Sequence, residues 1–525
     1  MKSSRIVERG SPLSQSFIWN LQARFYESLG IEAWLSGVIP SKITTNSFIA
    51  RTYARMIAAY ASETETSELT IVELGAGHGR FGFLCVIHLL EAAEQGLLPR
   101  TGWKYVLTDV AERNIEFWTR HEALRPLVER GVLDFARFEA GVDTELSLRA
   151  CGRKIGIDHP VENLAVVGNY FFDSLPIDVW RTVDGKLHEC LPVLRLNPEA
   201  PCCDPRDAAI LEHLDLDWEC EPRTSAGYSR TELNDLVEHF RRSLGDGAFT
   251  LPIGAFGLLE VLERWSNGGL ALLSADKGYT REHDLIGRPL PTMVQHGCFS
   301  FSVNFCALAK WFEARGGNAW LPDFRDGNLE FAAFRLGAKT DSRGSFDRAY
   351  REGPAEFGPG DFHQVVRRCE RTSPDLRSCL ALIRLSGHEP QVFYNLRRAI
   401  RAQLDSACDA DRDAVRETLE KVSKRFFHLD DVDVPFALGL VYQQLGEYEH
   451  AVRNYRRSLA LFGDDATALH NLALCYVALD DHEAARACAA SAVASDPEYD
   501  EARDLAARLE ASVSAATQAG PEPLA

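Results

Sequence analysis

The stretch TIVELGAGHGRFG, residues Thr70 to Gly82, decides how the first half of this chain folds. An apolar run that contains one acid, Glu73, leads into four closely spaced glycines: Gly75, Gly77, Gly79 and Gly82. A strand that breaks into a helix through glycines lets a ligand approach the backbone, and the helix N-terminus presents free N–H groups. We therefore predict a strand, a nucleotide-binding loop and a helix from about residue 81.

A second acid, Asp109, ends the next predicted strand, where it could hydrogen-bond ribose hydroxyls. It lies about 30 residues beyond Gly79, whereas the dinucleotide fingerprint places its acid about 20 residues on. Glu73 also fits the methyltransferase pattern acid-x-Gly-x-Gly, in which the acid lies near the methionine end of S-adenosylmethionine. The spacing favours S-adenosylmethionine over a dinucleotide. A glycine turn that only tightens a strand–helix junction is the alternative without a ligand.

Composition indicates a large, acidic, globular protein. The 525 residues suggest about three domains. Hydrophobic residues make up 46% and charged residues 25% of the chain, as in globular proteins. The net charge of −19 argues against a sequence-independent grip on DNA or RNA, because phosphate binding needs a positive surface. We therefore expect no nucleic-acid partner.

The 13 cysteines show no Cys-x-x-Cys and no Cys/His spacing typical of zinc, so we expect no metal site. Their scattered arrangement favours reduced thiols and a cytoplasmic protein. The N-terminus has no apolar core for a secretory signal, and no apolar run approaches the length of a membrane span. We therefore expect no membrane association.

Patterning divides the chain into an α/β part and a helical part. Residues 1–65 are predicted to be a helical segment of the first unit, and residues 66–336 to be a Rossmann-like domain with a mostly parallel sheet. A hairpin and a helix are expected in an insertion at about 185–250. Ligands in such sheets bind at the carboxyl ends of the strands. The predicted strands are 70–74, 104–108, 132–138 and 164–170, with helices near 81–95, 111–122 and 123–130.

Residues 337–361, rich in Gly, Ser, Arg and Asp, are the predicted linker, and 362–512 are predicted to be helical. Only the last two units of this helical part show a clear repeat, and two units cannot bury a continuous core alone. We therefore expect degenerate repeats over 362–427. A disordered tail is expected over 513–525. A pattern of small and aromatic residues repeats after 34 positions, which resembles the tetratricopeptide repeat and predicts an all-α superhelix. Leu438, Gly439, Tyr442, Ala451, Tyr455 and Ser458 recur as Leu472, Ala473, Tyr476, Ala485, Ala489 and Ala492.

The segment NYFFDSLP, Asn169 to Pro176, follows the fourth predicted strand. It is similar to the Asn-Glu-Phe-Phe-Asp-Ala-Leu-Pro element of the MidA-type methyltransferase family, whose mitochondrial members help assemble respiratory complex I by methylating an arginine. SADKGY, from Ser274, resembles the family's Asp-Tyr-Gly turn. HGCFSFSVNF, from His296, resembles its His…Val-Asp-Phe element, with Asn304 in place of Asp. The resemblance covers roughly residues 20–335 and implies a class I, S-adenosylmethionine-dependent methyltransferase fused to tetratricopeptide repeats.

The loop and the resemblance together predict the site residues. The cofactor is expected to contact Glu73, Gly75, Gly77, Gly79, Asp109, Phe138, Glu139 and Asn169, and the acceptor side to contain Asn169, Tyr170, Asp173, Asp276 and His296. Two simpler roles stay open: Asp173 as a helix cap, and His296 as an ordinary surface residue. Tyr170 stands where the family has Glu, and a phenol cannot hold a guanidinium with the same charge.

Three functions follow as hypotheses. The first is a methyltransferase acting on arginine or another side chain of a protein recruited by the repeats, whose concave surfaces suit peptides. The second, suggested by Tyr170, is a catalytically weakened adaptor or assembly chaperone that binds a partner through the repeats. The third, a nicotinamide oxidoreductase, is disfavoured by the late position of Asp109.

Overall fold

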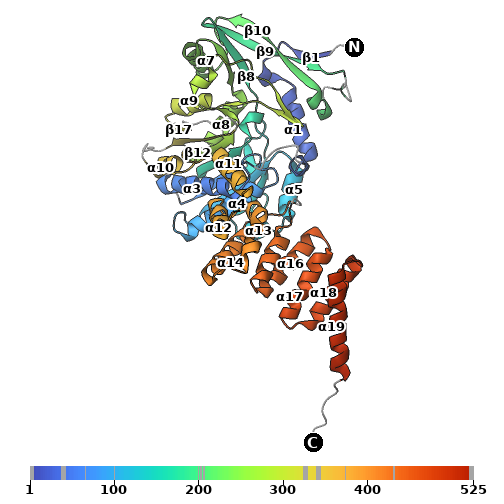
Figure 1. The fold of residues 1–525 in the computed structure, drawn as a ribbon. Helices are drawn as coiled ribbons and strands as arrows, with labels where there is room; N and C mark the ends of the chain where they lie inside the picture. The colour runs from blue at the N-terminus through green and yellow to red at the C-terminus, as the bar shows by residue number, and fades with distance from the viewer. Residues whose placement is uncertain are drawn as a thin grey trace. The chain divides into compact units, whose positions relative to one another are not determined.

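The computed structural model divides the chain into two compact units, Met1–His363 and Gln364–Ala525 (Figure 1). Only the backbone is described for His296 and for residues 512–518. Cys202 and Cys203 fall outside the described part of the chain. The structure describes residues 5–36, 43–64, 67–99, 101–198, 200, 204, 207–322, 329–337, 344–372, 374–429 and 432–518.

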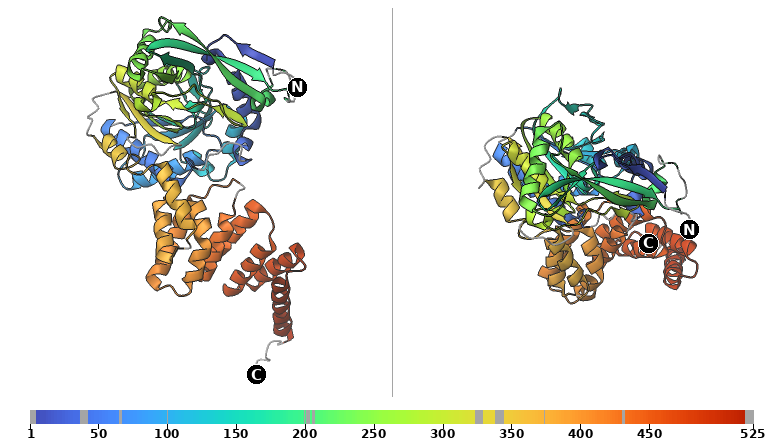
Figure 2. Two further views of the ribbon diagram at one scale, coloured as in Figure 1. Left: turned by 45° about the horizontal axis from the view of Figure 1, so that its top comes forward. Right: turned by 90° about the horizontal axis from the view of Figure 1, so that it is seen from above.

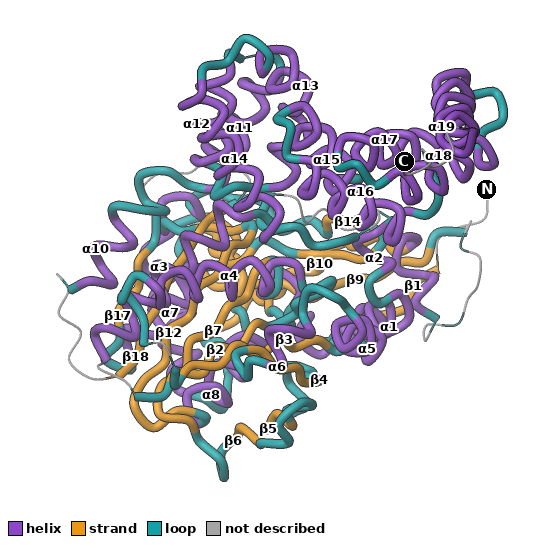
Figure 3. The backbone as a smooth tube through the Cα atoms, turned by 90° about the horizontal axis from the view of Figure 1, so that it is seen from below, coloured by secondary structure: helices purple, strands orange, loops and turns teal. Residues whose placement is uncertain are grey.

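A mixed sheet forms the centre of the first unit and, within the described residues, has seven strands (Figure 3). Strands β12, β7, β2, β3 and β4 are parallel, as the alternating pattern predicted, whereas β18 and β17 add antiparallel strands at one edge. Across the sheet the order is β17 (Asn318–Trp320), β18 (Glu330–Gly337), β12 (Ser266–Asp276), β7 (Val161–Asn169), β2 (Leu69–Glu73), β3 (Trp103–Asp109) and β4 (Leu133–Arg137).

Helices cover both faces of this sheet (Figures 1 and 3). α3 (Ser47–Thr64) and α4 (Arg80–Glu94) pack together on one face, and α8 (Ile253–Arg264) and α9 (Phe305–Ala314) pack on the other. All five residues of β2 are buried, as expected for a parallel strand covered on both sides. Shorter helices complete the unit: α1 (Ile18–Leu29), α2 (Glu32–Leu35), α5 (Glu112–Arg120) and α6 (Arg125–Glu129).

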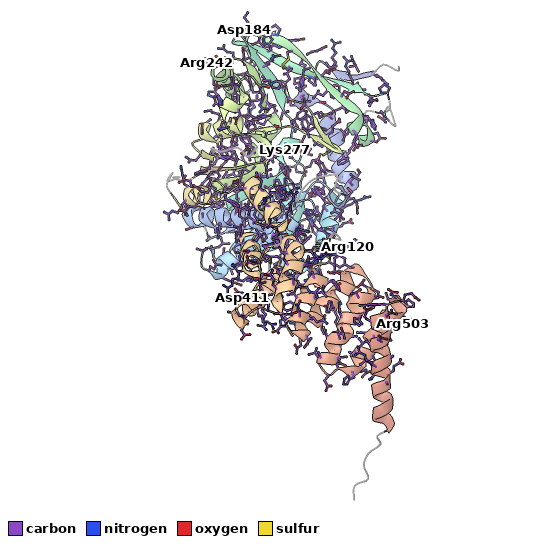
Figure 4. All side chains as sticks on the ribbon, in the orientation of Figure 1. Arg120, Asp184, Arg242, Lys277, Asp411 and Arg503 are labelled. Atoms are coloured by element: carbon purple, nitrogen blue, oxygen red, sulfur yellow. A yellow bond between two sulfur atoms is a disulfide. The ribbon has the colours of Figure 1, made fainter. Side chains whose placement is uncertain are left out.

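The predicted insertion belongs to a second, antiparallel sheet (Figure 2). Its hairpin and helix are present, but the strands β1, β10 and β11 were not predicted. Asp184, in the hairpin turn, and Arg242, on the helix, lie at the same end of the unit (Figure 4). The elements are β1 (Arg5–Arg9), β8 (Asp178–Val183), β9 (Lys186–Leu196), β10 (Leu214–Arg223), α7 (Thr231–Leu244) and β11 (Gly247–Leu251).

Three two-stranded pairings and several 3-10 turns connect these layers. The turn that matters for the site, η2 (Phe172–Ser174), follows β7 directly. The other 3-10 turns are η1 (Leu13–Gln15), η3 (Ala208–His213) and η4 (Glu282–Leu285). The pairs are β5 (Glu145–Ser147) with β6 (Lys154–Gly156), β13 (Gly278–Tyr279) with β16 (Val303–Asn304), and β14 (Val294–His296) with β15 (Cys298–Ser300).

The segment predicted as a linker contains a packed helix, α10 (Ser345–Arg351). Its first turn binds the carboxylate of Glu63 on α3: the Phe346 N–H donates to Glu63 Oε1 at 2.6 Å. The Phe346 ring contacts Tyr60 and Trp320. Residues 344–361 therefore belong to the first unit rather than to an extended linker, because α10 completes the apolar cover beside α3.

The second unit consists of antiparallel helix pairs. Gly439 on α15 faces the Tyr455 ring on α16, and an added Cβ would lie 2.7 Å from that ring. In the next pair the small residues Ala473, Ala485 and Ala489 are fully buried. The helices are α11 (Pro359–Glu370, which begins in the first unit), α12 (Leu376–Leu385), α13 (Pro390–Leu404), α14 (Asp409–Lys424), α15 (Val434–Gln444), α16 (Tyr448–Phe462), α17 (Ala466–Ala478), α18 (His482–Ser495) and α19 (Asp500–Gln518).

Cysteine chemistry differs from the expectation. Cys190 on β9 and Cys220 on β10 are directly opposite each other in the antiparallel register and form a disulfide. The prediction of reduced thiols is wrong for this pair, because strand pairing brings together two cysteines that look scattered in the sequence. Among the described residues no cluster of His, Cys, Asp and Glu could hold a metal ion.

Among the described residues, no helix has both the length and the apolar character that crossing a membrane requires.

Candidate functional site

A cavity of about 450 Å³ lies at the carboxyl ends of β2, β3, β4 and β7. Its size is that of an ordinary small-molecule site. The glycine loop after β2 and residues of α1 and α2 line it. Of the predicted site residues, Glu73, Gly75, Asp109, Phe138, Glu139, Asn169 and Tyr170 line it.

The glycine loop needs its glycines for two reasons. Gly75, Gly77 and Gly79 have φ of 61°, 57° and 78°, the left-handed region that favours glycine. An added Cβ would also meet an aromatic ring at each position: Phe171 at 2.9 Å, Trp34 at 2.9 Å and Trp118 at 2.8 Å, respectively. Gly77 and Gly79 are not among the residues that line the cavity, so they shape the loop rather than the lining.

Glu73 is a buried acid beneath the first turn of α4. Its carboxylate accepts a hydrogen bond from the Tyr105 hydroxyl at 3.0 Å. Burial, together with the negative charge of Asp109, raises the pKa of Glu73 from its ordinary 4.5 to about 8, against the opposing effect of the Tyr105 bond. A Cβ at Gly82 would collide with this carboxylate, which explains the fourth glycine.

Asp109 holds the loop from the neighbouring strand. Its carboxylate accepts hydrogen bonds from the N–H groups of Gly77 and Ala111, each at 2.9 Å. Burial raises the pKa of Asp109, and these backbone donors oppose the rise. On the other side of the loop, the Trp118 indole donates to the Gly77 carbonyl at 3.1 Å. Asp109 therefore fixes the loop as well as lining the cavity.

The two residues directly after β4 contribute an apolar and a charged side chain to the site. Phe138 is buried against Trp265, with ring centroids 5.5 Å apart, and Glu139 accepts an ion-pair hydrogen bond from Arg137 at 2.8 Å. Both line the cavity, and their contact with the cofactor stays a prediction.

His78 was not predicted as a site residue, although it lies within the glycine loop and lines the cavity. Burial lowers the pKa of His78 to about 3, with a contribution from Arg80. Its Nδ1 accepts the Arg80 N–H at 3.2 Å, so the neutral ring carries its proton on Nε2.

Asn169 and Tyr170 form the wall after β7. The Asn169 Oδ1 accepts hydrogen bonds from the Tyr53 hydroxyl and from the Ala275 N–H, which leaves its NH₂ group as the donor. Tyr170 has φ of 48°, uncommon for a residue other than glycine. Its N–H donates to the Ala275 carbonyl at 3.0 Å. Strained backbone of this kind is typical of functional sites.

Asp173 and Asp276 do not line the cavity but lie together behind its wall. The Asp276 carboxylate accepts the N–H groups of Phe172, Asp173 and Lys277, at 3.0, 3.1 and 2.8 Å. Asp276, predicted at the substrate mouth, is therefore the internal anchor of η2. No helix begins directly after Asp173, because the next element after η2 is the strand β8. This excludes the alternative in which Asp173 caps a helix.

His296 lies on β14, and its side chain is outside the described part of the structure. Asn304, the departure from the family's Asp, caps α9, because its side-chain oxygen accepts the Ala307 N–H at 3.1 Å. Asn and Asp perform this role equally well.

The helix α1 contributes cavity residues that sequence reasoning missed. Trp19, Gln22 and Tyr26 recur at helical spacing on the face that lines the cavity, and Trp34 on α2 packs on the Gly77 turn. The only signal in the sequence was the aromatic character of this helix. That pattern is equally typical of a core helix, so it could not be assigned to the site.

Apart from His78, which burial keeps neutral, the ionisable side chains of the lining include acids but no Lys or Arg among the described residues. Glu73, Asp109 and Glu139 contribute carboxyl groups, and no Lys or Arg is among the described residues that line the cavity. The cavity is thus arranged to favour a ligand with positive charge.

In the second unit, residues 432–498 match the family model of the Tetratricopeptide repeat. The match spans α15 to α18, whose pairing through Gly439 and Tyr455 is described above. Residues 432–498 are tetratricopeptide repeats. The predicted period and residue types are confirmed over these two units.

Two solved structures from Burkholderia thailandensis resemble the chain. One is an inferred methyl transferase bound to S-adenosyl-homocysteine, with 12% identity, a TM-score of 0.41 and coverage of 65% of this chain and 91% of that chain. The other is an uncharacterized protein that, like the first, is described as a member of the COG1565 superfamily. It has 12% identity, a TM-score of 0.40 and coverage of 64% of this chain and 89% of that chain. Likeness at this level is too low to support a functional conclusion.

No curated protein matches this sequence significantly.

Proposed function

We propose that the first unit is an S-adenosylmethionine-dependent methyltransferase of the MidA type. The observation that supports this most directly is the lining of the cavity: three carboxyl groups and no Lys or Arg among the described lining residues. A dinucleotide pyrophosphate carries negative charge and would be repelled by such a lining, whereas a sulfonium with an ammonium group would be attracted. The cavity therefore fits S-adenosylmethionine better than NAD.

The residues present also fit the shape that the ligand requires. The glycine loop, whose cradle an added Cβ would fill, brings backbone close to the cavity. Glu73 would hold the ammonium end, Asp109 the ribose, and Phe138 with Glu139 the adenine. When bound, S-adenosylmethionine supplies a methyl group activated by its sulfonium. The chain's contribution is then to bind and orient the two reactants, which accounts for much of the rate of such displacements.

We further propose that the acceptor belongs to a protein bound by the tetratricopeptide repeats, since such arrays offer concave surfaces for peptides. The side chain methylated could be an arginine or another residue, because Tyr170 replaces the acid that would hold a guanidinium. We also propose a cytoplasmic protein, although the Cys190–Cys220 disulfide counts against it, because structural disulfides persist mainly in oxidising compartments. Both thiols reduced in cell extracts would support the cytoplasm, and an intact disulfide there would refute it.

Calorimetry with three ligands tests the cofactor. We expect low-micromolar binding of S-adenosylmethionine and of S-adenosyl-homocysteine, with no binding of NAD under the same conditions. Circular dichroism would confirm that the protein is folded. A folded protein that binds neither of the first two ligands would refute the proposal, and selective binding of NAD would replace it with an oxidoreductase.

A second candidate function is an adaptor that has lost catalysis, and Tyr170 is the observation that favours it. Transfer of labelled methyl groups from S-adenosylmethionine into proteins of cells lacking the gene separates the two. Transfer that is lost in Asp173→Ala but kept in Tyr170→Phe supports the enzyme. Cofactor binding without any transfer supports the adaptor.

A further inference from the structure

The ligand proposed for the cavity carries two opposite charges at its methionyl end. Its amino-acid group holds an ammonium and a carboxylate on the same carbon atom, so both charges enter the site together. The carboxyl groups of Glu73, Asp109 and Glu139 favour the ammonium but disfavour the carboxylate. A site that selects the whole group therefore needs a hydrogen-bond donor for the negative end, and the described lining offers no Lys or Arg for this purpose.

Two polar side chains of the lining already use their donors inside the protein. The Trp19 indole donates to the Leu13 carbonyl at 2.7 Å, and the Ser174 hydroxyl donates to Asp173 Oδ1 at 2.9 Å. An indole has one N–H and a hydroxyl has one O–H. Neither group therefore has a proton left for a ligand while these bonds are in place.

His78 differs, because its donor is open to the cavity. The Arg80 N–H occupies Nδ1 at 3.2 Å, which leaves the proton of the neutral ring on Nε2. Within the described residues the His78 side chain makes no other hydrogen bond. The residue is 6% exposed, yet its Nε2 atom is accessible, and the space in front of it is the cavity that His78 lines. The Nε2–H group is therefore available to a ligand.

The ring of His78 is held from two sides. The backbone of α4 fixes it through the Arg80 N–H, and Trp34 on α2 meets it edge to face, with ring centroids 6.3 Å apart. Trp34 also packs on the turn at Gly77, so the ring and the loop are positioned together. A donor that is held in place before the ligand arrives loses little conformational freedom on binding.

The electrostatic surroundings of His78 suit a neutral donor beside an anion. Burial and the positive charge of Arg80 lower the pKa of His78 to about 3, so the ring is uncharged at neutral pH. A neutral donor does not repel the ammonium and sulfonium of the same ligand. The charge of Arg80 also favours an anion at this point of the cavity.

We propose that His78 recognises the carboxylate of the cofactor, with Nε2–H as the donor, while Glu73 takes the ammonium on the same carbon atom. This rests on the proposed methyltransferase function and assigns the residue that selects the negative part of its amino-acid end. His78 is then a specificity-determining residue, which separates ligands that carry the carboxylate from ligands that lack it.

Calorimetry with S-adenosylmethionine and its decarboxylated analogue tests the assignment. The analogue keeps the sulfonium and the ammonium but has no carboxylate. His78→Asn keeps an oxygen that can accept the Arg80 N–H but lacks the Nε2–H donor. Its Kd for S-adenosylmethionine should rise by about 10-fold to 100-fold, the loss expected for one hydrogen bond to a charged group. Its Kd for the analogue should stay within about twofold of the wild type, because that ligand never made the bond.

His78→Gln tests the donor from the other direction. The amide N–H of Gln reaches about as far along the side chain as Nε2 of His, whereas the acceptor for the Arg80 N–H is lost. Affinity for S-adenosylmethionine should therefore recover to within about fivefold of the wild type. A role of His78 in holding the loop alone predicts the reverse order of the two variants.

His121 provides a matched control. Its Nδ1 accepts the Ala123 N–H at 3.2 Å, two residues further on, as His78 does with Arg80, but His121 does not line the cavity. His121→Asn should therefore leave both affinities unchanged. Thermal unfolding of each variant shows whether it is folded before binding is measured.

Nuclear magnetic resonance of the protein with ¹⁵N-labelled histidine gives a readout that does not depend on affinity. The cofactor-free protein should show His78 protonated on Nε2 and neutral at pH 7. S-adenosylmethionine should shift the Nε2 proton downfield, as a new hydrogen bond to a carboxylate does, whereas the decarboxylated analogue should leave it in place.

The results that overturn this assignment differ from those that overturn the methyltransferase function. Unchanged affinity for S-adenosylmethionine in His78→Asn, an equal loss for both ligands, or a ring protonated on Nδ1 would each refute it. A carboxylate-specific loss in Asn169→Ser, with none in His78→Asn, would assign the donor to the Asn169 amide instead. A folded wild type that binds neither ligand would overturn the proposed function itself.

Discussion

Replacing Glu73 with Gln should make the cofactor-free protein more stable at neutral and alkaline pH. The same change should weaken binding of the cofactor. In the folded chain the pKa of Glu73 is raised from 4.5 to about 8, so the folded state holds this proton more tightly than the unfolded state does. The contribution of this proton to the free energy of unfolding is therefore fully present below about pH 4.5 and is lost as the pH rises through about 8. Gln has no proton to lose, and its carbonyl oxygen can still accept the Tyr105 hydroxyl.

The magnitude follows from the size of the shift. Between pH 6 and pH 8 the wild type should lose about 2 kcal/mol of unfolding free energy through this group alone, and Glu73→Gln should lose none of it. Urea unfolding at several pH values measures the difference. Glu129→Gln, which changes an exposed carboxylate on α6, is the control for the loss of one surface charge.

The same substitution should act in the opposite direction on binding. An ammonium group beside Glu73 favours its ionised form, so the wild type should release a proton on binding S-adenosylmethionine at pH 7. The measured heat of binding should therefore depend on the ionisation enthalpy of the buffer that takes up this proton. Glu73→Gln should bind at least tenfold more weakly and release no proton. Equal pH dependence of stability in the wild type and Glu73→Gln would refute the reasoning.

Three further predictions concern the glycine loop, the repeats and the disulfide. Gly82→Ala should destabilise the first unit by about 1–3 kcal/mol, because its Cβ would collide with Glu73 and Leu107. Gly257→Ala, at an exposed position on α8 with open space around it, should instead stabilise the unit by about 0.5–1 kcal/mol. Thermal unfolding measures both changes, and equal effects of the two variants would contradict the prediction. Gly439→Ala should destabilise the second unit by about 1–3 kcal/mol through the Tyr455 ring without changing cofactor affinity, and an unchanged melting curve would count against this. Replacing both Cys190 and Cys220 with Ser should cost about 3.6 kcal/mol for a loop of this length under non-reducing conditions. Thiol titration that finds both thiols free in the wild type would exclude the disulfide.

The sequence predicted the elements whose signals are local. The run before Gly75 became β2, Asp109 ended β3 as expected, and the period that includes Gly439 marked the repeats. Each depends on residues close together in the chain, where glycine conformation and helix or strand periodicity act directly.

The remaining features depend on contacts between distant segments. Asp276 was expected at the substrate mouth, but it binds backbone N–H groups about 100 residues earlier in the chain. Tyr26 reaches the cavity because α1 packs across strand ends that follow it by many residues, and Cys190 meets Cys220 only through strand register. Strand β10 was missed because its alternating acids read as a polar loop. Tertiary placement, rather than propensity, decides these cases.

The three carboxyl groups in the cavity wall, with no Lys or Arg among the described lining residues, have a consequence for turnover. Methyl transfer converts a sulfonium cation into a neutral thioether, so the ligand loses one positive charge while the carboxyl groups of Glu73, Asp109 and Glu139 stay in place. The electrostatic attraction that favoured the reactant is then reduced for the product, most strongly at low ionic strength. The cavity would hold the spent ligand less tightly than the fresh one, and the charge of its wall would help to clear the site for the next cycle.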